Sequence, residues 1–493
     1  MRRIEVTPRP DWRERCDAVG FSFYDLESEG GRPYWSEGAA YVFTSPEIEL
    51  IEAATKELFD RCMDAVEHVV RHRRFDEFGI PGRFHELVRA SWDDDDPTVY
   101  GRFDLAYDDG AGAPGLAGRP TAPGSRRPPT VKLLEFNADT PTSLVETAAA
   151  QWQWLEEQTA AGVLPAGADQ FNGLHELLIE QWEHVRTARW GLAPGARLHL
   201  ASLHDTGDPG AELIVEDFDT VAYMAETAAA AGFDPKLIFM EELSFSLERG
   251  LFLDADGEPV RHIFKLYPWE WMIAEQFGGF LPNSRGVTAW VEPAWKLLLS
   301  NKQLLVVLWE LFPGHPNLLP AFAEPESGAD ATGAGATAGA TAGATAGTGP
   351  DALSALAGRA TVRKPRLGRE GANVTVLDAS GAVVAEASGA YGDEGFIVQE
   401  RARFSDIPGK TAVIGSWIVG ETPAGIDLRE TSGPITGDLA EFVAHYIEPD
   451  DGGAGSLQTG RGTARAASDT PPAAPANPAD GGAGPGIRGR MEA

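Results

Sequence analysis

Apolar side chains recur close to the helical period between residues 46 and 70. The positions concerned are Ile48, Ile51, Leu58, Met63, Val66 and Val70. Ser45 can cap the first turn, and Pro46 fits there because the first turn of a helix does not need its missing N–H group. The pattern predicts a long amphipathic helix with one buried face.

Short runs rich in β-branched and large apolar residues follow along the chain. They are TVKLLEFN (130–137), RLHLASL (197–203), KLIFMEEL (236–243) and HIFKLYP (262–268). The stretch between the second and third runs, residues 216–232, has helical composition and ends at Gly232. Strand, helix and strand in this order predict a βαβ unit and an open α/β sheet.

The last third of the chain alternates with the period of strands. Its runs are RATVRKP (359–365), ANVTVLD (372–378), GAVVAEA (381–387), GFIVQER (395–401) and TAVIGSWIV (411–419). The tripeptide GID (425–427) is interpreted as a further turn. Several short strands joined by turns predict an antiparallel arrangement.

Three stretches differ in composition from the rest. Residues 110–129 are rich in Gly and Pro and predict an exposed loop. Residues 325–349 repeat the tetrapeptide ATAG, which has no apolar face to stack, so we interpret the repeat as an insertion within a loop. Residues 450–493 are mostly small and polar, which predicts a disordered tail.

Charge and composition restrict the class of partner. The 493 residues include 41 Lys and Arg against 74 Asp and Glu, a formal charge of −33. Such a field repels nucleic acid and anionic membranes, and no apolar run reaches the roughly 18 residues of a membrane span. We expect small-molecule partners, no nucleic acid and no membrane. Two cysteines and no apolar secretory signal favour a cytoplasmic location.

A candidate phosphate site lies between Val362 and Asp378. Lys364 ends a predicted strand and is followed by a turn that contains Gly368, Arg369 and Gly371. An ammonium group beside free backbone N–H groups forms a cradle for phosphate oxygens. The alternative is a β-hairpin turn with solvated basic residues, and the spacing alone leaves both open.

A candidate metal site combines oxygen donors from two predicted strands. Asp104 lies in RFDLAYDD, and Glu135 and Asn137 are two residues apart in LLEFN, so their side chains share one face. Carboxylate and amide oxygens suit Mg²⁺, which commonly binds beside substrate phosphates. The alternative for each is an ordinary solvated side chain.

The tryptophans, Trp271 among them, are interpreted as core residues.

Eight separated blocks in one order carry a resemblance. They are RFDLAYDDG, LLEFNADTPTSLVE, HDTGD, KLYPWEWM, NKQLLVVLWELFPGHPNLLPAF, VRKPRLGREGANV, VQERARF and AVIGSWIVG…GIDLRE. Over residues 13–447 they closely resemble the glutathionylspermidine synthase family. The resemblance implies a mixed α/β and α+β chain with an ATP-grasp fold. Its expected parts are residues 1–300 on the substrate side, residues 301–449 clamping the nucleotide, and the tail.

The same resemblance implies catalytic and metal-binding roles. Asp104, Glu135 and Asn137 match the family's Mg²⁺ ligands. Arg102 matches the arginine that faces the transferred phosphoryl group and the acceptor carboxylate, and Arg369 matches the residue that closes over the reacting centre.

Nucleotide contacts are implied as well. Lys302 and Lys364 match two lysines that hold the phosphates, beside the glycines of the candidate cradle. Gln399 and Arg401 lie in the segment 398–401, which matches the hinge that meets adenine.

The resemblance also implies substrate contacts, from hydroxyl, basic and acidic side chains. Thr140 and Thr142 stand where the family has small hydroxyl residues near its thiol peptide, and Arg429 matches an arginine at the peptide site. Glu216 and Asp217 fall near an acidic pair that attracts a polyamine, but their position favours a solvated helix start as the role of both.

By resemblance, the chain is an ATP-dependent carboxylate–amine ligase that works through an acyl phosphate, as in the joining of glutathione to spermidine. ATP is a co-substrate and Mg²⁺ the cofactor. We expect no counterpart of the family's N-terminal amidase, because the synthetase motifs begin close to residue 1. The alternatives are a ligase for another peptide or amino-acid carboxylate and a non-catalytic ATP-binding protein.

Overall fold

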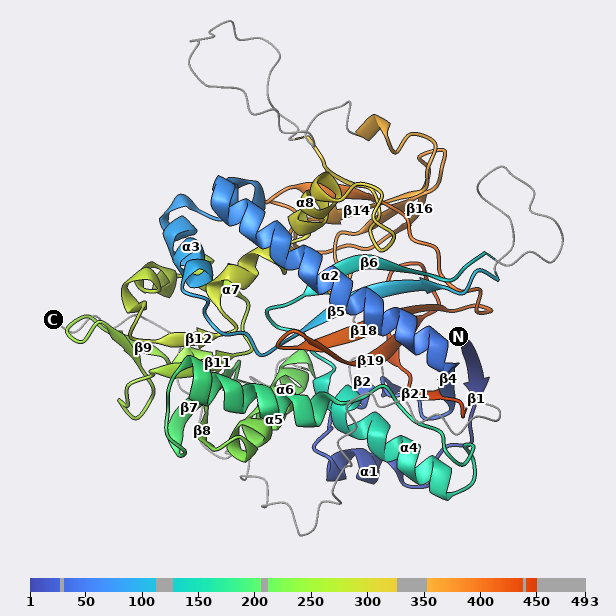
Figure 1. The fold of residues 1–493 in the computed structure, drawn as a ribbon, viewed down its shortest axis with the longest axis horizontal. Coiled ribbons are helices and arrows are strands. Elements are labelled where there is room, and N and C mark those ends of the chain that lie inside the picture. The colour runs from blue at the N-terminus through green and yellow to red at the C-terminus, as the bar shows by residue number, and fades with distance from the viewer. Residues whose placement is uncertain (27–30, 112–126, 205–211, 326–352, 438–439, 450–493) are drawn as a thin grey trace, which may run out of the picture. The chain divides into compact units, whose positions relative to one another are not determined.

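The computed structural model describes residues 1–26, 31–111, 127–204, 212–325, 353–437 and 440–449. Most of the predicted loop at 110–129, the ATAG repeat from residue 326 onward and the predicted tail at 450–493 lie outside the described residues. The described part is a mixed α/β structure with several sheets (Figure 1).

A five-stranded antiparallel sheet joins distant parts of the sequence. Its order is β20 (Glu441–Phe442), β19 (Thr422–Thr431), β18 (Thr411–Val419), β5 (Tyr100–Asp108) and β6 (Thr130–Asn137). The predicted GID turn is wrong, because residues 425–427 lie inside β19. The chain instead turns at Gly420, whose φ of 57° is readily adopted only without a Cβ.

Helix α2 (Ser45–His72) crosses one face of this sheet (Figure 1). The predicted helix is confirmed, but Thr44 rather than Ser45 is its N-cap. The backbone N–H and the hydroxyl of Thr44 both donate to the Glu47 carboxylate, at 3.0 and 3.2 Å, which stabilises the entry to the helix. Leu58 and Val66 of the predicted apolar face are fully buried against the sheet.

A parallel sheet lies beside the antiparallel one. Its order is β12 (Ala289–Val291), β11 (His262–Lys265), β7 (Ala196–Ser202) and β8 (Phe233–Phe239). Helix α6 (Glu212–Ala230) connects β7 to the parallel strand β8, so the predicted βαβ unit is confirmed. The strand predicted to reach residue 243 ends at Phe239, and a 3₁₀ turn at Met240–Glu242 follows it.

The last third of the chain forms a second five-stranded sheet, as predicted from its alternation. Its order is β13 (Ala321–Ala323), β17 (Phe396–Glu400), β14 (Thr361–Pro365), β15 (Thr375–Leu377) and β16 (Val383–Glu386). All its neighbouring strands are antiparallel. Helix α8 (Gln303–Leu311) packs against β13 and also contacts α2.

The remaining elements support these sheets. The smaller sheets are β1 (Arg2–Glu5) with β4 (Ala39–Phe43) and β21 (His445–Ile447), β2 (Asp25–Leu26) with β3 (Arg32–Pro33), and β9 (Ser244–Ser246) with β10 (Leu251–Leu253). The other α-helices are α1 (Trp12–Ala18), α3 (His85–Asp93), α4 (Gln151–Ala160), α5 (Leu174–His184) and α7 (Trp269–Ala274). Two π-helical segments are η4 (Glu146–Ala150) and η5 (Val185–Arg189). The 3₁₀ turns other than that at 240–242 are η2 (Phe75–Phe78), η3 (Gly82–Phe84), η7 (Gln276–Phe280), η8 (Pro282–Ser284) and η9 (Ala294–Leu298).

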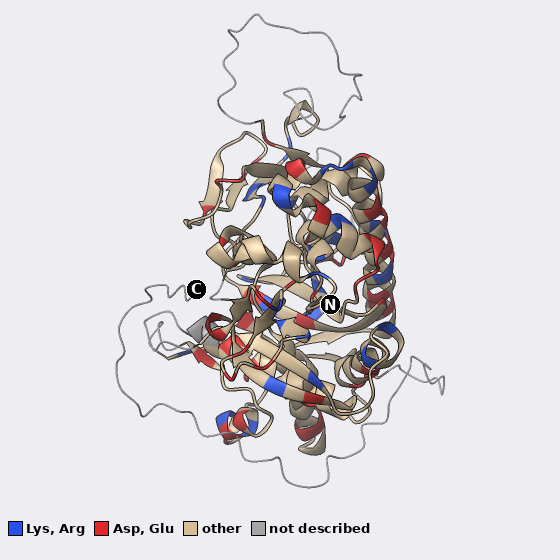
Figure 2. Ribbon diagram, turned by 90° about the vertical axis from the view of Figure 1, so that its left-hand side faces the viewer, with Lys and Arg blue, Asp and Glu red and all other residues tan. Residues whose placement is uncertain are grey.

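Charged residues are spread over the molecule instead of forming one basic face. Figure 2 shows acidic segments on helices and loops throughout, with basic segments among them. None of the helices in the described part of the chain has the length and apolar composition needed to cross a bilayer.

Candidate active site

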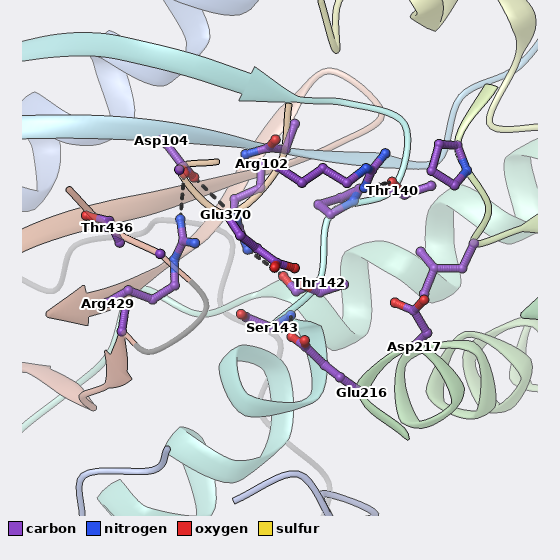
Figure 3. A pocket seen from close by; sticks show the side chains of 18 of the residues that line it. Arg102, Asp104, Thr140, Thr142, Ser143, Glu216, Asp217, Glu370, Arg429 and Thr436 are labelled. Atoms are coloured by element: carbon purple, nitrogen blue, oxygen red, sulfur yellow. Dashed lines mark hydrogen bonds and ion pairs between the residues drawn. The ribbon is translucent and has the colours of Figure 1, made fainter. Parts of the chain in front are cut away.

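A cavity of about 330 Å³ lies where four parts of the fold meet. Strands β5, β6 and β19 supply one wall, the loop that follows β6 supplies a second, and the first half of α6 and the turn after β14 complete it. Figure 3 shows the charged side chains that point into this space.

Two arginines and one aspartate form the most charged wall of the cavity. Arg102 donates from Nε to Asp104 Oδ1 at 3.1 Å, and Arg429 donates from Nη2 to Asp104 Oδ2 at 2.6 Å (Figure 3). Arg102 also donates from Nη1 to the Thr142 carbonyl oxygen at 2.6 Å. Burial alone would lower the pKa of Arg429, but the charges of Asp104 and Asp427 raise it above its ordinary value. The Arg429 guanidinium therefore stays charged, and together with the Arg102 guanidinium it can bind an anion.

Glu135 and Asn137 lie on the same face of β6 as predicted, and both line the cavity. Glu135 Oε2 is 3.0 Å from Lys302 Nζ. Burial tends to raise the pKa of Glu135, but the charges of Lys302 and Lys364 lower it below its ordinary value. Glu135 is therefore a charged oxygen donor at neutral pH.

Lys302 and Lys364 lie behind Glu135 and do not line the cavity. Lys364 donates to the Leu134 carbonyl at 3.0 Å and to Gln399 Oε1 at 2.9 Å. Lys302 donates to the Gly368 carbonyl at 2.8 Å. The two predicted nucleotide lysines thus converge beside Glu135, Lys302 from the N-cap of helix α8 and Lys364 from strand β14.

The predicted metal ligands Asp104, Glu135 and Asn137 line one cavity and offer only oxygen atoms that Mg²⁺ accepts. The set fits a magnesium ion chemically, with each carboxylate at present paired to a basic side chain. Another cluster of ligand types, His199, Asp254 and Glu258, fits less well. Lys236 Nζ lies 2.7 Å from Asp254 and 3.1 Å from Glu258, so an ammonium group already neutralises it.

The turn after β14 folds over the cavity through Arg369. Its Nη1 donates to Thr140 Oγ1 at 2.8 Å and its Nη2 to Glu270 Oε1 at 3.1 Å. The guanidinium lies 5.5 Å from the centre of the Trp271 ring. Trp271 is 37 % exposed and lines the cavity, so its interpretation as a core residue is wrong.

The loop after β6 is held by a buried ion pair that sequence reasoning missed. Lys265 Nζ lies 2.5 Å from Asp139 Oδ1, and Asp139 Oδ2 accepts the Trp269 N–H at 2.8 Å. Both side chains of the pair are buried. Because an isolated charge is costly there, the pair fixes the neighbouring Thr140 and Thr142 relative to α7.

Acidic side chains occupy the end of the cavity beside α6. Glu216 accepts the Ser143 N–H at 3.2 Å, and burial raises the pKa of both Glu216 and Asp217 (Figure 3). Glu216 is only 7 % exposed, so the solvated helix start considered for it is wrong. Glu146, which sequence reasoning missed, is 2 % exposed, and its Oε1 has no hydrogen-bond partner among the described residues. Its only sequence signal is a lone acid in an apolar helical stretch.

The predicted hinge residues lie away from this cavity. Gln399, on β17, contacts Lys364 and donates to the Leu133 carbonyl at 3.2 Å. Arg401 follows β17, and its backbone N–H donates to the Ala360 carbonyl at 2.9 Å. Neither side chain lines the cavity.

A family model and a curated relative each match most of the chain. A family model described as "Glutathionylspermidine synthase preATP-grasp" matches residues 3–448. A putative acid–amine ligase of Haemophilus influenzae is 33% identical over 455 residues, which cover 91% of this chain and 100% of that protein. Trypanothione synthetase of Crithidia fasciculata is 27% identical over 418 residues, or 80% of this chain and 54% of that protein.

Two more distant matches complete the comparison. The bifunctional glutathionylspermidine synthetase/amidase of Escherichia coli is 22% identical over 409 residues, 78% of this chain and 55% of that protein. The chain thus spans about half the length of this protein and of the trypanothione synthetase. Among solved structures, a glutathione synthetase-like effector from Globodera pallida has a TM-score of 0.44 and 11% identity, covering 82% of this chain and 88% of that one.

Proposed function

The chain belongs to the glutathionylspermidine synthase family and is an ATP-dependent carbon–nitrogen ligase, and from this premise we propose that it joins a carboxylate to an amine through an acyl phosphate. The observation that carries the proposal is the meeting of Arg102 and Arg429 with Asp104, Glu135 and Asn137 in one cavity. In this cavity, cationic side chains that can bind anions lie beside side chains whose oxygen atoms can bind a metal ion.

The basic groups divide between two anions. Arg102 and Arg429 bind the substrate carboxylate, and Lys302 and Lys364 bind nucleotide phosphates. Asp104, Glu135 and Asn137 would hold Mg²⁺, which when bound neutralises phosphate charge. We also propose the ATP-grasp assignment: the sheet of β13–β17 supplies Lys364 and Gln399 to the nucleotide, with Gly368, Gly371 and Arg401 next to them.

The transfer itself needs alignment and charge neutralisation more than a side-chain nucleophile. The substrate carboxylate oxygen attacks the γ-phosphorus, and the bond to ADP breaks. Arg102 and Arg369 stabilise the negative charge of the transferred group. The amine nitrogen then attacks the acyl carbon, phosphate leaves, and the amine loses a proton.

The acidic end of the cavity selects the second substrate. Glu216 and Asp217 line it, and Glu146, whose Oε1 has no hydrogen-bond partner among the described residues, lies buried close to Glu216. An ammonium group would pair with these carboxyl groups, whose pKa burial raises. A cationic amine such as spermidine fits this end, and Thr140, Thr142 and Arg429 fit a peptide such as glutathione.

ADP release tests the proposal. Purified protein with ATP and Mg²⁺ is expected to release ADP and phosphate only when a suitable carboxylate and an amine are both present, with glutathione and spermidine as the first pair. Lys364→Ala is expected to lower the rate at least about 100-fold, because the nucleotide phosphate loses the lysine ammonium group that binds it. Lys410→Ala, which removes a lysine that pairs with Glu430 and Glu441, is the control.

The alternatives predict other results. A ligase for another peptide or amino-acid carboxylate would stay inactive with glutathione but give an amide product by mass spectrometry in a wider screen. A non-catalytic ATP-binding protein would bind ATP and release no ADP with any pair. Equal rates in Lys364→Ala and the parent would refute the assigned nucleotide site.

A further inference from the structure

Asp427 is a buried acid directly behind the two arginines of the cavity. It lies on β19 two residues before Arg429, is fully buried and does not line the cavity. Its Oδ2 accepts the Trp417 indole N–H at 2.7 Å. Its Oδ1 has no hydrogen-bond partner among the described residues, and Arg429 Nε, 3.7 Å away, has none either.

A glycine makes room for this carboxylate. Gly415 on β18 is paired with Asp427 on β19 on one side and with Asp104 on β5 on the other. A methyl group at position 415 would overlap the Asp427 carboxylate. The side chain of Asp427 thus lies across β18, toward the strand that carries Arg102 and Asp104.

The surrounding charges explain why an acid is tolerated there. Burial raises the pKa of Asp427, and the positive charges of Arg102 and Arg429 act against this rise. Arg102 also lies over the Trp417 ring, 5.7 Å from its centre. Asp427 and Trp417 therefore form a common support for both guanidinium groups.

Asp104 alone cannot be that support if the proposed function holds. Its two oxygens now hold Arg102 and Arg429, yet the proposed function assigns the same oxygens to Mg²⁺. A carboxylate that binds a cation holds a guanidinium group less strongly. Asp427 is outside the cavity, so its position beside Arg429 does not depend on what Asp104 binds.

We propose that Asp427 is a positioning residue that, with Trp417, keeps Arg102 and Arg429 aimed into the cavity to receive the anionic acid substrate. This inference rests on the proposed function for the identity of the anion. The arrangement of the arginines is a property of the chain itself.

The first test is structural and needs no substrate. In a crystal structure of Asp427→Asn, the Arg429 side chain is expected to leave its position beside Asp104 or to become disordered, while β18 and β19 keep their register. Both guanidinium groups in unchanged positions would overturn the proposal. This outcome is separate from a failure of the proposed function, which would appear as an absence of ADP release in the parent protein.

The second test separates positioning from stability. With glutathione and spermidine, or the pair that the screen identifies, Asp427→Asn is expected to raise KM for the carboxylate substrate about tenfold and to change KM for ATP less than about twofold. Equal rises in both values would contradict a role specific to the arginines.

Glu430→Gln is the matched control. Glu430 is also a fully buried acid on β19, but it faces the other side of the sheet and pairs with Arg3, Tyr41 and Lys410. It is expected to lower stability without changing either KM. If Asp427→Asn does not fold, Trp417→Phe removes the indole N–H that donates to Asp427 and reduces the ring beneath Arg102. It is expected to shift KM in the same direction by a smaller factor, and an unchanged KM there would refute the proposal.

Discussion

At the scale of single residues, burial changes what Lys364 can do. Burial and the neighbouring charge of Lys302 lower the pKa of Lys364 to about 8, although the negative charge of Glu135 favours the protonated amine. Lys364 is 8 % exposed, and its Nζ donates to two oxygen acceptors. A lysine recognisable in the sequence as a phosphate ligand therefore titrates close to physiological pH.

ATP binding is predicted to weaken as the pH rises through about 8. A bound phosphate favours the charged amine, so above pH 8 binding must also take up a proton, and affinity falls by up to about tenfold per pH unit. Below pH 7 the amine is already charged, and this contribution is constant. Isothermal titration with ATP between pH 6.5 and 9 measures the slope.

Lys364→Arg is the control for that slope. Arginine keeps its charge over this range. In the variant, the pH dependence of ATP binding that comes from position 364 therefore disappears, whatever the variant's absolute affinity for ATP. Parallel slopes in the parent and in Lys364→Arg would show that another group causes the change.

At the scale of elements, the turn after β14 depends on two glycines. Gly371 has a φ of 71°, and a Cβ there would lie 2.8 Å from both the Thr436 carbonyl oxygen and Ile435 Cγ2. At Gly368, a Cβ would lie 2.8 Å from Pro365 Cγ. The turn is therefore packed closely against segment 435–436 while it carries Arg369 over the cavity.

Gly371→Ala is predicted to damage this turn more than a positive φ alone explains. Gly381, between β15 and β16, has a φ of 84° with nothing within 4 Å of a Cβ, so Gly381→Ala measures the backbone cost by itself, about 1–2 kcal/mol. Overlap with Thr436 adds about 1–3 kcal/mol in Gly371→Ala and displaces Arg369. Urea unfolding and ADP release of the two variants are the measurements.

The comparison of the two glycines has a clear contrary outcome. Equal stability and equal ADP release in Gly371→Ala and Gly381→Ala would mean that the turn has room to move. The close packing of Gly371 would then have no part in holding the site.

At the scale of the whole molecule, buried histidines link stability to pH. His445 is fully buried on β21, where its Nδ1 lies 2.9 Å from Gln151 Oε1, and burial lowers its pKa to about 3. In the unfolded chain the imidazole takes up a proton below about pH 6.5. The folded chain does not, so the unfolded state binds more protons between these values.

The free energy of unfolding is predicted to fall as the pH drops below about 6.5, and to be insensitive to this group above it. His445 contributes a loss of roughly 1 kcal/mol at pH 5.5. Urea unfolding of the parent and of His445→Asn at pH 7.5 and 5.5 tests this. The parent is expected to lose about 1 kcal/mol more than the variant between the two values, and an identical loss would exclude His445 as the cause.

Much of the local structure follows from the sequence alone. Apolar spacing predicts α2, and strand, helix and strand predict the unit from β7 to β8, because each of these patterns lies within one continuous stretch of the chain. Two boundaries differ from the prediction. The cap at Ser45 is wrong because Thr44 and Glu47 form a local capping box, and the turn at 425–427 is wrong because these residues pair with β18 inside the sheet. The division between residues 300 and 301 stays a prediction.

Residue types, their local spacing and their resemblance to a known family were determined by the sequence, including the shared face of Glu135 and Asn137 and the glycine turn beside Lys364. Only the tertiary structure decided that Asp427 lies behind two arginines, that Glu146 Oε1 has no partner in the described part of the chain, and that Lys265 holds the loop after β6. The physical reason is that burial and charge pairing depend on contacts between chain segments up to 325 residues apart, as between Asp104 and Arg429. No local pattern contains that information.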